Sequence, residues 1–389
     1  MARKTKEQLE KIKKDNNVEN IFSWSRYNCY KNSSYEYFLK YIKKEKETRN
    51  NVYSLMGSSS HSCLDDYYNG KIKYEDMYDE FQSEYLNATL MDLKFNRSDD
   101  EKNEKIAIKY KACMDHFFKK HIPIEHDLIT EKYILIWVNK FLFGGYFDAI
   151  HKDKDGNYVI TDWKSSTIYT GKKIDQEKGQ LLLYAEGIRQ MGIPLERIKI
   201  RWAFLKYLTI SMPLKKLEED GITRVIRTTN AERHAWVGKV KSNASMWLKE
   251  LDTYTKEEID DMLDYSVNFN TIENLPQEIQ DLYTIEDCYV EALLTEEEID
   301  NLKDDIYKTL VEIYTKEKEY EKTKDDIVFW EEVTQANSYY FANLCGFNAQ
   351  QHLPYGKFLD SLESFVDDEY KVDKNRSELS YDWMSELNL

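Results

Sequence analysis

Residues 144–188 read GGYFDAIHKDKDGNYVITDWKSSTIYTGKKIDQEKGQLLLYAEGI, and this stretch decides the fold that the sequence predicts. Its residue pattern predicts strands over 141–151 and 157–163, and the Asp-Gly pair that ends at Gly156 between them is a good hairpin turn. Apolar residues at helical spacing then predict a helix over 174–191. A strand hairpin followed at once by a helix is the nucleus of a mixed sheet covered by helices.

The same stretch concentrates acidic and basic side chains. Asp162 and Lys164 flank Trp163, so both point to one face of their strand, because side chains alternate with period two. Asp148 follows a glycine pair at the end of the preceding strand, and glycines there let a metal or a phosphate approach closely. Two carboxylates can share a divalent cation, and a lysine beside them can handle a water or the charge of a phosphate. This pattern favours metal-dependent cleavage of a phosphodiester.

Each of these residues also has a plainer interpretation. Asp148 alone could be a turn residue, and Asp162 with Lys164 could be a surface ion pair of little energetic weight. Against the second interpretation, Val159 and Ile160 indicate a largely buried strand, where a charge pair needs a reason.

Polar residues outside the two strands are further candidates. Gln180 and Tyr184 are four residues apart and share a helix face, which could also be the solvated flank of that helix. Glu131 begins the first predicted strand of the core and is an additional candidate for the same cleft. His61 is expected to begin a helix after a serine-rich turn at 57–60, although a lone histidine is more often structural. Three further histidines show no metal-ligand spacing and are interpreted as incidental: His116, His121 and His126.

The flanking sequence completes the predicted fold. Residues 23–127 are mainly helical in pattern, residues 128–138 predict a strand, and residues 197–210 predict the last strand of the core. Residues 211–335 show helix signals and no strand alternation. The fold class that results is α+β with an α/β core, namely a mixed sheet flanked by helices with large helical additions.

Charge is distributed unevenly along the chain. The net charge of −16 argues against a nucleic-acid binder, but residues 1–210 carry about +5 and residues 211–389 about −21. The half with the candidate site is therefore mildly basic. The acidic half could restrain non-specific DNA binding, or it could be a solubilising face.

Cysteine use and hydropathy indicate the compartment. Five cysteines are scattered with no CxxC pair, which fits a reducing environment. The charged N-terminus lacks the apolar segment of a secretory signal, and no run approaches the roughly 18 apolar residues of a membrane span. We expect a cytoplasmic protein of a bacterium or a phage-infected host, with no membrane partner.

The motifs and their order along the chain resemble those of the PD-(D/E)XK nuclease superfamily. The resemblance is specifically to its RecB-type exonuclease branch, which includes the AddB-like nuclease domains. A helix histidine comes first in that branch, and the GxxD, DxK and QxxxY motifs follow it. The matching residues here are His61, Gly145 with Asp148, Asp162 with Lys164, and Gln180 with Tyr184. The resemblance covers about 23–210, with a weaker echo at 336–355.

The resemblance implies a restriction-endonuclease-like fold and a role for each residue. His61, Asp148 and Asp162, with the carbonyl of Trp163, would hold Mg²⁺ or Mn²⁺. Lys164 would position or activate the attacking water and stabilise charge on the phosphate. Gln180 and Tyr184, catalytic residues in this reading, would orient the DNA end or the lysine.

The implied function is a DNA exonuclease of recombination, repair or phage DNA processing. The sequence has no Walker A motif and so no helicase motor of its own. Besides DNA as partner, this leaves either a free-standing nuclease or one that works with a separate helicase or recombinase. A catalytically silent DNA-binding or scaffold subunit that retains the fold is the alternative, and a DNA-mimicking inhibitor is a third possibility. Intact Asp148, Asp162 and Lys164 speak against a silent subunit.

Several members of this branch also hold an iron–sulfur cluster through one upstream and three downstream cysteines. Here Ser33 and Ser34 occupy the Cys-Pro positions of the upstream motif, Cys29 is displaced by a turn, and downstream only Cys345 remains. We expect that the cluster is absent and that aromatic packing between 23–41 and 336–358 closes the domain instead.

Six segments follow from these patterns. They are a basic leader (1–22), the helical N-terminal part of the nuclease domain with the His motif (23–127), the catalytic core (128–210), an acidic helical region (211–335), a closing segment of the nuclease domain (336–360) and an acidic tail (361–389).

Overall fold

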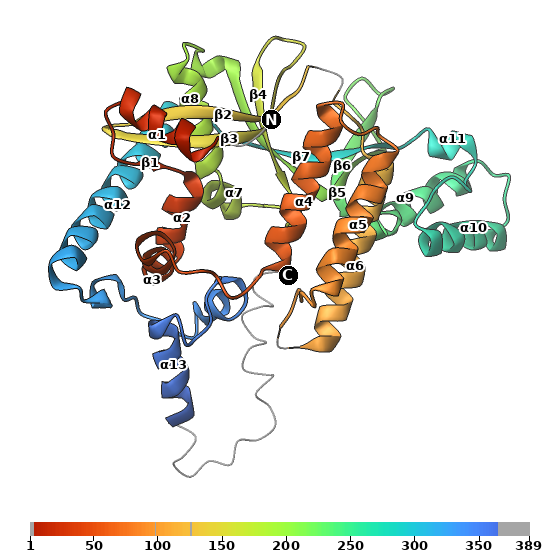
Figure 1. Cartoon of the computed structure of the whole chain (residues 1–389). Coiled ribbons are helices and arrows are strands. Elements are labelled where there is room, and N and C mark those ends of the chain that lie inside the picture. Colours follow the sequence, from red (N-terminus) through yellow and green to blue (C-terminus); the bar gives the residue numbers. More distant parts are fainter. Residues whose placement is uncertain (1–3, 98, 125–126, 365–389) are drawn as a thin grey trace.

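A seven-stranded mixed sheet forms the centre of the computed structural model, which describes residues 4–97, 99–124 and 127–364 (Figure 1). The strand order is β1-β3-β4-β5-β6, while β2 pairs with β3 and β7 pairs with β5. The strands are β1 (Ile21–Phe22), β2 (Ile129–Val138), β3 (Phe141–Lys152), β4 (Tyr158–Lys164), β5 (Ile198–Leu217), β6 (Arg224–Glu232) and β7 (Thr284–Ala292). The predicted mixed sheet flanked by helices is confirmed.

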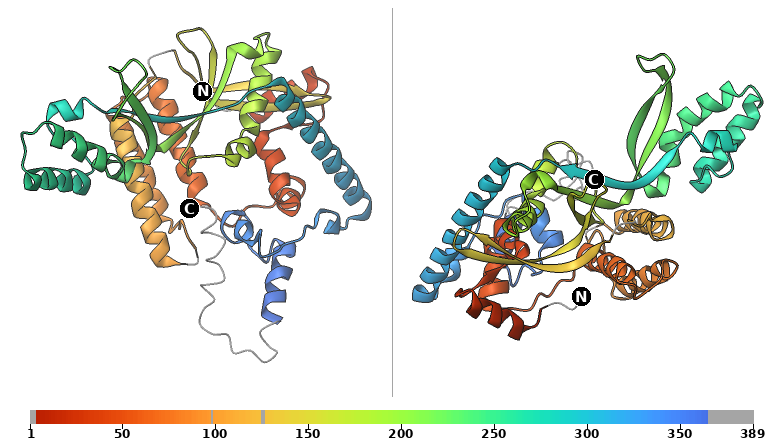
Figure 2. Two further views of the ribbon diagram at one scale, coloured as in Figure 1. Left: turned by 180° about the vertical axis from the view of Figure 1, so that it is seen from behind. Right: turned by 90° about the horizontal axis from the view of Figure 1, so that it is seen from above.

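Helices cover both faces of the sheet (Figures 1 and 2). Their bounds are α1 (Lys6–Asp15), α2 (Trp24–Asn32), α3 (Ser34–Tyr37), α4 (Val52–Tyr68), α5 (Asp76–Leu90), α6 (Asp100–Lys120), α7 (Lys172–Glu177), α8 (Gly179–Gln190), α9 (Val237–Glu250), α10 (Lys256–Phe269), α11 (Gln277–Gln280), α12 (Glu296–Thr323) and α13 (Leu353–Ser364). None of the helices in the described part of the chain combines the length and apolar character needed to cross a membrane.

Strand β4 lies between an antiparallel neighbour, β3, and a parallel neighbour, β5. Parallel neighbours need a crossover connection, and α7 and α8 supply it. The two faces of β4 join different cores, since Ile160 packs with α8 and Trp163 packs with α4 and α6. The sequence between 141 and 190 therefore builds the predicted hairpin and helix, with one break in the helix at Lys178.

Two expectations about local structure are wrong. No turn separates residues 57–60 from His61, because α4 begins after Asn51, whose side chain accepts a hydrogen bond from Tyr53 N at 2.9 Å. Within the helix, the hydroxyls of Ser59 and Ser60 donate to carbonyls four residues back, Leu55 O at 3.0 Å and Met56 O at 2.8 Å, instead of capping a new helix.

The acidic region 211–335 is not only helical. It supplies β6 and β7, which both pair with β5. Strand β6 is largely exposed and polar, so it lacks the apolar alternation that would mark a strand, and pairing with the long β5 holds it. Beyond this sheet edge, α9, α10 and α11 form a lobe with its own core around Trp236 and Leu263, and this lobe projects from the body in Figure 2.

Segments from the two ends of the described chain close the domain beside α12. The Tyr30 hydroxyl on α2 donates to Glu312 at 2.7 Å, and the Tyr37 hydroxyl on α3 donates to Glu317 at 3.0 Å. Glu36 is buried and accepts bonds from Tyr340 Oη at 2.5 Å and from Gly346 N at 3.2 Å. Acids of the C-terminal half therefore serve as hydrogen-bond acceptors for N-terminal tyrosines.

Ser33 and Ser34 take part in the same closure. The Ser33 hydroxyl lies 3.0 Å from His352 Nε2, and Ser34 N donates to Glu331 Oε2 at 2.8 Å. The Tyr35 ring packs edge-on against the His352 ring at 5.1 Å. The predicted basic leader falls partly outside the described residues at 1–3, the acidic tail does so from 365, and His126 also lies outside them.

Candidate active site

The end of strand β4 carries the densest charge of the site. Lys164 Nζ lies 2.6 Å from Asp162 Oδ2, and the Asp162 side chain is only 5% exposed. Burial alone would lower the pKa of Lys164, but the charges of Asp162 and Asp148 outweigh it and hold that pKa above its ordinary value. In the metal-free site the two carboxylates therefore favour the charged form of Lys164.

Asp148 reaches the same place from strand β3. Its Oδ2 accepts a hydrogen bond from Trp163 N at 2.9 Å. Burial raises the pKa of Asp148 to about 6 and the nearby charge of Asp162 adds to this, while His61 and Lys164 oppose it. Two carboxylates that repel each other at a buried position are a suitable place for a cation.

His61 approaches from helix α4 and meets the other side of the Trp163 peptide. Its Nε2 lies 2.8 Å from the Trp163 carbonyl oxygen, which can only accept, so Nε2 carries a proton here. Its Nδ1 lies 3.5 Å from Asp148 Oδ1. The peptide of Trp163 is thus held on its N–H side by a carboxylate and on its carbonyl side by an imidazole.

Gln180 and Tyr184 face the site from helix α8, where Gln180 Nε2 donates to Tyr184 Oη at 3.3 Å. The Tyr184 ring packs against Phe147 on β3 at 4.9 Å. Burial raises the pKa of Tyr184 above its ordinary value, so its hydroxyl stays protonated. The helix therefore presents a fixed, neutral, hydrogen-bonding pair beside Asp148.

Glu131 is the third residue of β2 and has a backbone φ of +47°, which is uncommon for a residue other than glycine. It stands opposite Asp148 in the ladder, between the pairs Thr130–Ala149 and Lys132–Phe147. Its side chain lines a pocket of about 590 Å³ that His61 also lines. Acidic residues predominate in this pocket, and its charged or ionisable lining includes His61, Asp65, Asp66, Lys71, Glu80, Glu84 and Glu131.

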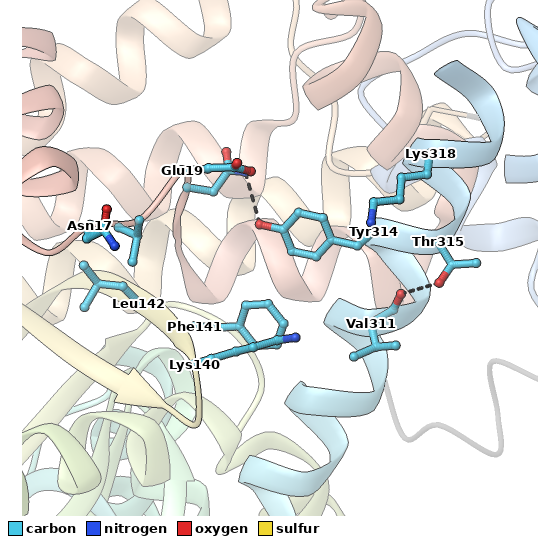
Figure 3. A pocket seen from close by; sticks show the side chains of 11 residues that line it. Asn17, Glu19, Lys140, Phe141, Leu142, Val311, Tyr314, Thr315 and Lys318 are labelled. Carbon is cyan, nitrogen blue, oxygen red and sulfur yellow. Dashed lines mark hydrogen bonds between the residues drawn. The ribbon is translucent and has the colours of Figure 1, made fainter. Parts of the chain in front are cut away.

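A pocket of about 430 Å³ lies elsewhere, where residues 17–20 and the start of β3 meet α12 (Figure 3). Phe141 and Tyr314 stack there with ring centroids 5.8 Å apart, and Asn20 donates to Tyr314 Oη at 3.2 Å. None of the candidate site residues lines this pocket. Its position therefore separates it from the chemistry at β4.

The donor atoms at β4 fit a hard divalent cation in type. Two carboxylates, an imidazole and a carbonyl are ligands that Mg²⁺ and Mn²⁺ accept. Adjacent ligands of an octahedral ion at about 2.1 Å stand about 3 Å apart. His61 Nε2 and Trp163 O are 2.8 Å apart, so both could bind one ion once the ion replaces the proton that Nε2 carries in the metal-free site. Within the described residues no three His, Cys, Asp or Glu side chains are grouped so that they could hold a metal ion. Asp162 is paired with Lys164 instead.

The five cysteines are free, and Cys29 and Cys345 both belong to the closure described above. Burial, together with the charge of Glu36, raises the pKa of Cys29 to about 12, so the thiol stays protonated.

Comparison with known families now identifies the class of protein. The chain belongs to the PD-(D/E)XK nuclease superfamily, whose sequence model matches residues 21–314 of 389. Nucleases of this superfamily are typically metal-dependent hydrolases. No curated protein matches the chain. The match extends beyond the expected 23–210, through the lobe and into α12.

Some residues around the site carry no signal in the sequence. The Trp163 ring contacts the ring of His61, with centroids 5.7 Å apart, and the ring of Tyr68, with centroids 6.2 Å apart. Tyr68 follows His61 by seven residues and so shares its face of α4, but it belongs to no motif. Helical spacing alone would have marked it only as one of several tyrosines on this helix.

Proposed function

We propose that the chain is a divalent-metal-dependent DNA exonuclease of the RecB type. His61, Asp148 and Asp162, with the Trp163 carbonyl, would hold Mg²⁺ or Mn²⁺. The observation that carries this proposal is the meeting of an acid pair, a lysine and a helix histidine around one peptide of β4. Glu131 is an additional candidate ligand, through its place opposite Asp148.

The side chains divide the work as follows. Lys164, held as an ammonium, orients the attacking water and stabilises the charge that develops on the phosphate. The Gln180–Tyr184 pair would orient Lys164 by accepting a hydrogen bond from its ammonium, or the DNA end by donating hydrogen bonds. A bound divalent ion supplies Lewis acidity and lowers the pKa of water.

The proposed substrate is DNA in recombination, repair or phage DNA processing, in the cytoplasm. A separate helicase or recombinase is the proposed partner, because this sequence carries no Walker A motif of its own.

The test is cleavage of end-labelled single- and double-stranded DNA with Mn²⁺, with closed circular DNA and RNA in parallel. Asp162→Ala should abolish cleavage, whereas Asp155→Ala, on the exposed hairpin turn, should cleave like the wild type. Linear DNA should be degraded and closed circles spared. Cleavage unchanged by Asp162→Ala, or absent from the wild type, would refute the proposal.

A catalytically silent DNA-binding or scaffold subunit is the second candidate. The pairing of Asp162 with Lys164 favours it, because the acid is engaged in an internal contact. DNA binding without cleavage of any substrate across Mg²⁺ and Mn²⁺ concentrations would select this candidate.

We also propose that the domain holds no iron–sulfur cluster. The contacts of Ser33, Ser34 and Glu36 with the C-terminal segment support this, since they join the same parts of the chain that a cluster would join. Iron content and visible absorbance of anaerobically purified protein test it, and stoichiometric iron would refute it.

A further inference from the structure

A buried row of polar side chains runs from the Trp163 ring toward the lobe. The Tyr68 ring lies nearly parallel to the Trp163 indole, at an interplanar angle of 14°. Its hydroxyl lies 3.0 Å from His121 Nε2, beyond the end of α6, and accepts from Ile124 N at 3.2 Å. Tyr68 therefore contacts the β4 end of the site with its ring and the segment that follows α6 with its hydroxyl.

His121 connects Tyr68 to strand β7 of the sheet. His121 Nδ1 lies 2.6 Å from Asp287 Oδ2 on β7, and Asp287 Oδ1 bonds the guanidinium of Arg233. A carboxylate accepts, so Nδ1 donates, which leaves Nε2 to accept from the Tyr68 hydroxyl. Although burial would raise the pKa of Asp287, the bond from His121 and the charge of Arg233 hold that pKa below its ordinary value.

This row is costly to bury. His121 is 6% exposed, Asp287 is 7% exposed and Arg233 is fully buried. A buried ion pair gains little or nothing over apolar residues of the same volume, so stability alone does not account for it. A fully partnered network does, however, fix the positions of the groups it joins.

Here the network fixes the position of helix α4, which carries His61, beside the candidate metal site. Tyr68 and His61 are two turns apart on α4, and both rings contact the Trp163 ring, His61 edge-on and Tyr68 nearly parallel. Any rotation or slide of α4 would therefore separate His61 Nε2 from the Trp163 carbonyl, which are now 2.8 Å apart. Tyr68 is held against such movement by His121 and, through it, by Asp287.

We infer that Tyr68, His121 and Asp287 are positioning residues that keep His61 and the Trp163 carbonyl at ligand spacing; this inference rests on the proposed metal-dependent function. None of the three touches the reacting atoms. Their loss should therefore weaken metal binding and leave the chemistry of the loaded site nearly intact.

The deciding variant is Tyr68→Phe, which keeps the ring and removes only the hydroxyl. The matched control is Tyr53→Phe, on the same helix, whose hydroxyl donates to Phe95 O at 3.2 Å outside this row. We expect the half-saturating Mn²⁺ concentration to rise about threefold to tenfold in Tyr68→Phe, the worth of one hydrogen bond, with kcat at saturating Mn²⁺ changed less than about twofold. Tyr53→Phe should match the wild type in both.

A double-mutant cycle tests the connection itself. If Tyr68 acts through His121, Tyr68→Phe combined with His121→Phe should weaken Mn²⁺ binding no more than the worse single variant. If the two single losses of Mn²⁺ affinity multiply in the double variant, the inference is wrong. It is also wrong if folded Tyr68→Phe keeps the Mn²⁺ dependence of the wild type. A drop in kcat with unchanged Mn²⁺ affinity would overturn it too.

A readout independent of cleavage separates this inference from the proposed function. In protein labelled with ¹⁵N-histidine, the His61 imidazole resonances should move in Tyr68→Phe and stay in place in Tyr53→Phe. Wild-type protein that neither binds Mn²⁺ nor cleaves DNA would end the proposed function, while unmoved His61 resonances in Tyr68→Phe would end the positioning role.

Discussion

Gly145 and Tyr184 are in direct contact across the site, one on strand β3 and the other on helix α8. Cε1 of the tyrosine ring lies 2.7 Å from the position that a Cβ atom on residue 145 would take, and the hydroxyl oxygen lies 3.0 Å from it. Atoms do not approach so closely, so any side chain at 145 must displace the ring. The position of Tyr184, the tyrosine of the QxxxY motif, therefore requires a glycine at residue 145, the glycine of the GxxD motif.

Gly145→Ala should displace Tyr184 and, with it, the neighbouring Gln180. We expect a loss of stability of about 1–3 kcal/mol from overpacking and a loss of cleavage rate of about tenfold or more from misplacement. Thermal unfolding and DNA cleavage measure the two effects. Gly238→Ala on α9 is the control, since a Cβ there meets nothing within 4 Å, and it should be neutral or stabilising. Wild-type cleavage by Gly145→Ala would contradict the packing argument.

Asp148 should make metal-free stability fall with rising pH. Its folded pKa of about 6 lies above the ordinary 3.8, so the folded state holds the proton more tightly. The stability that this proton provides is complete below about pH 4 and is lost as the pH rises through 6. Asp148→Asn should therefore raise the Tm of metal-free protein at pH 8 and make little difference at pH 4.

Protons should also compete with the metal at Asp148. Cleavage with limiting Mn²⁺ should decline below about pH 6 and recover when more Mn²⁺ is added. Asp155→Asn serves as the control for both measurements. A Tm difference between Asp148→Asn and the wild type that stays constant from pH 4 to pH 8 would show that Asp148 titrates normally.

Lys164→Met should separate catalysis from metal binding. The substitution removes the cation that pairs with Asp162, so the carboxylate is released for a metal ligand role. We expect cleavage to fall about a hundredfold or more, with Mn²⁺ binding by calorimetry as tight as in the wild type or tighter. Lys199→Met, whose lysine pairs with Asp153 on the exposed hairpin, is the matched control. Loss of Mn²⁺ binding together with cleavage would assign Lys164 a structural role.

Glu36→Gln should loosen the closure of the domain. A glutamine keeps one acceptor oxygen and turns an amide toward the other donor, so either Tyr340 Oη or Gly346 N loses its partner. One buried donor left unsatisfied costs about 1–3 kcal/mol. The measurement is urea unfolding, with Glu45→Gln, an exposed partner of Lys43, as the control. Equal stability of the two variants would remove Glu36 from the closure.

The central part of the fold could be predicted because its signals are local. A hairpin turn, period-two strands and a 3.6-residue helix all lie between 141 and 190, and the acid pair, Lys164, Gln180 and Tyr184 lie on those elements. His61 could be placed near them only by the family resemblance. The prediction that a helix begins at His61 is wrong because serine hydroxyls can either cap a helix or donate to carbonyls within it.

The remaining features depend on contacts between distant segments. Strand β7 is recognisable only through its pairing with β5, because its burial pattern is irregular. The Tyr68, His121 and Asp287 row joins residues up to 219 positions apart. Neither composition nor spacing marks His121 as different from an incidental histidine. Such features come from tertiary structure and leave no periodic trace.

The hydrogen bonds between α2, α3 and α12 determine when the protein can finish folding. Tyr30 and Glu312 are 282 residues apart, and Tyr37 and Glu317 are 280 apart. A ribosome adds about 5–20 residues per second, so the tyrosines emerge many seconds before their acceptors. During that interval α2 and α3 have no partner for the face they later bury. The nascent chain therefore carries an aromatic surface that is covered only after α12 and the residues that follow it, up to His352, have emerged.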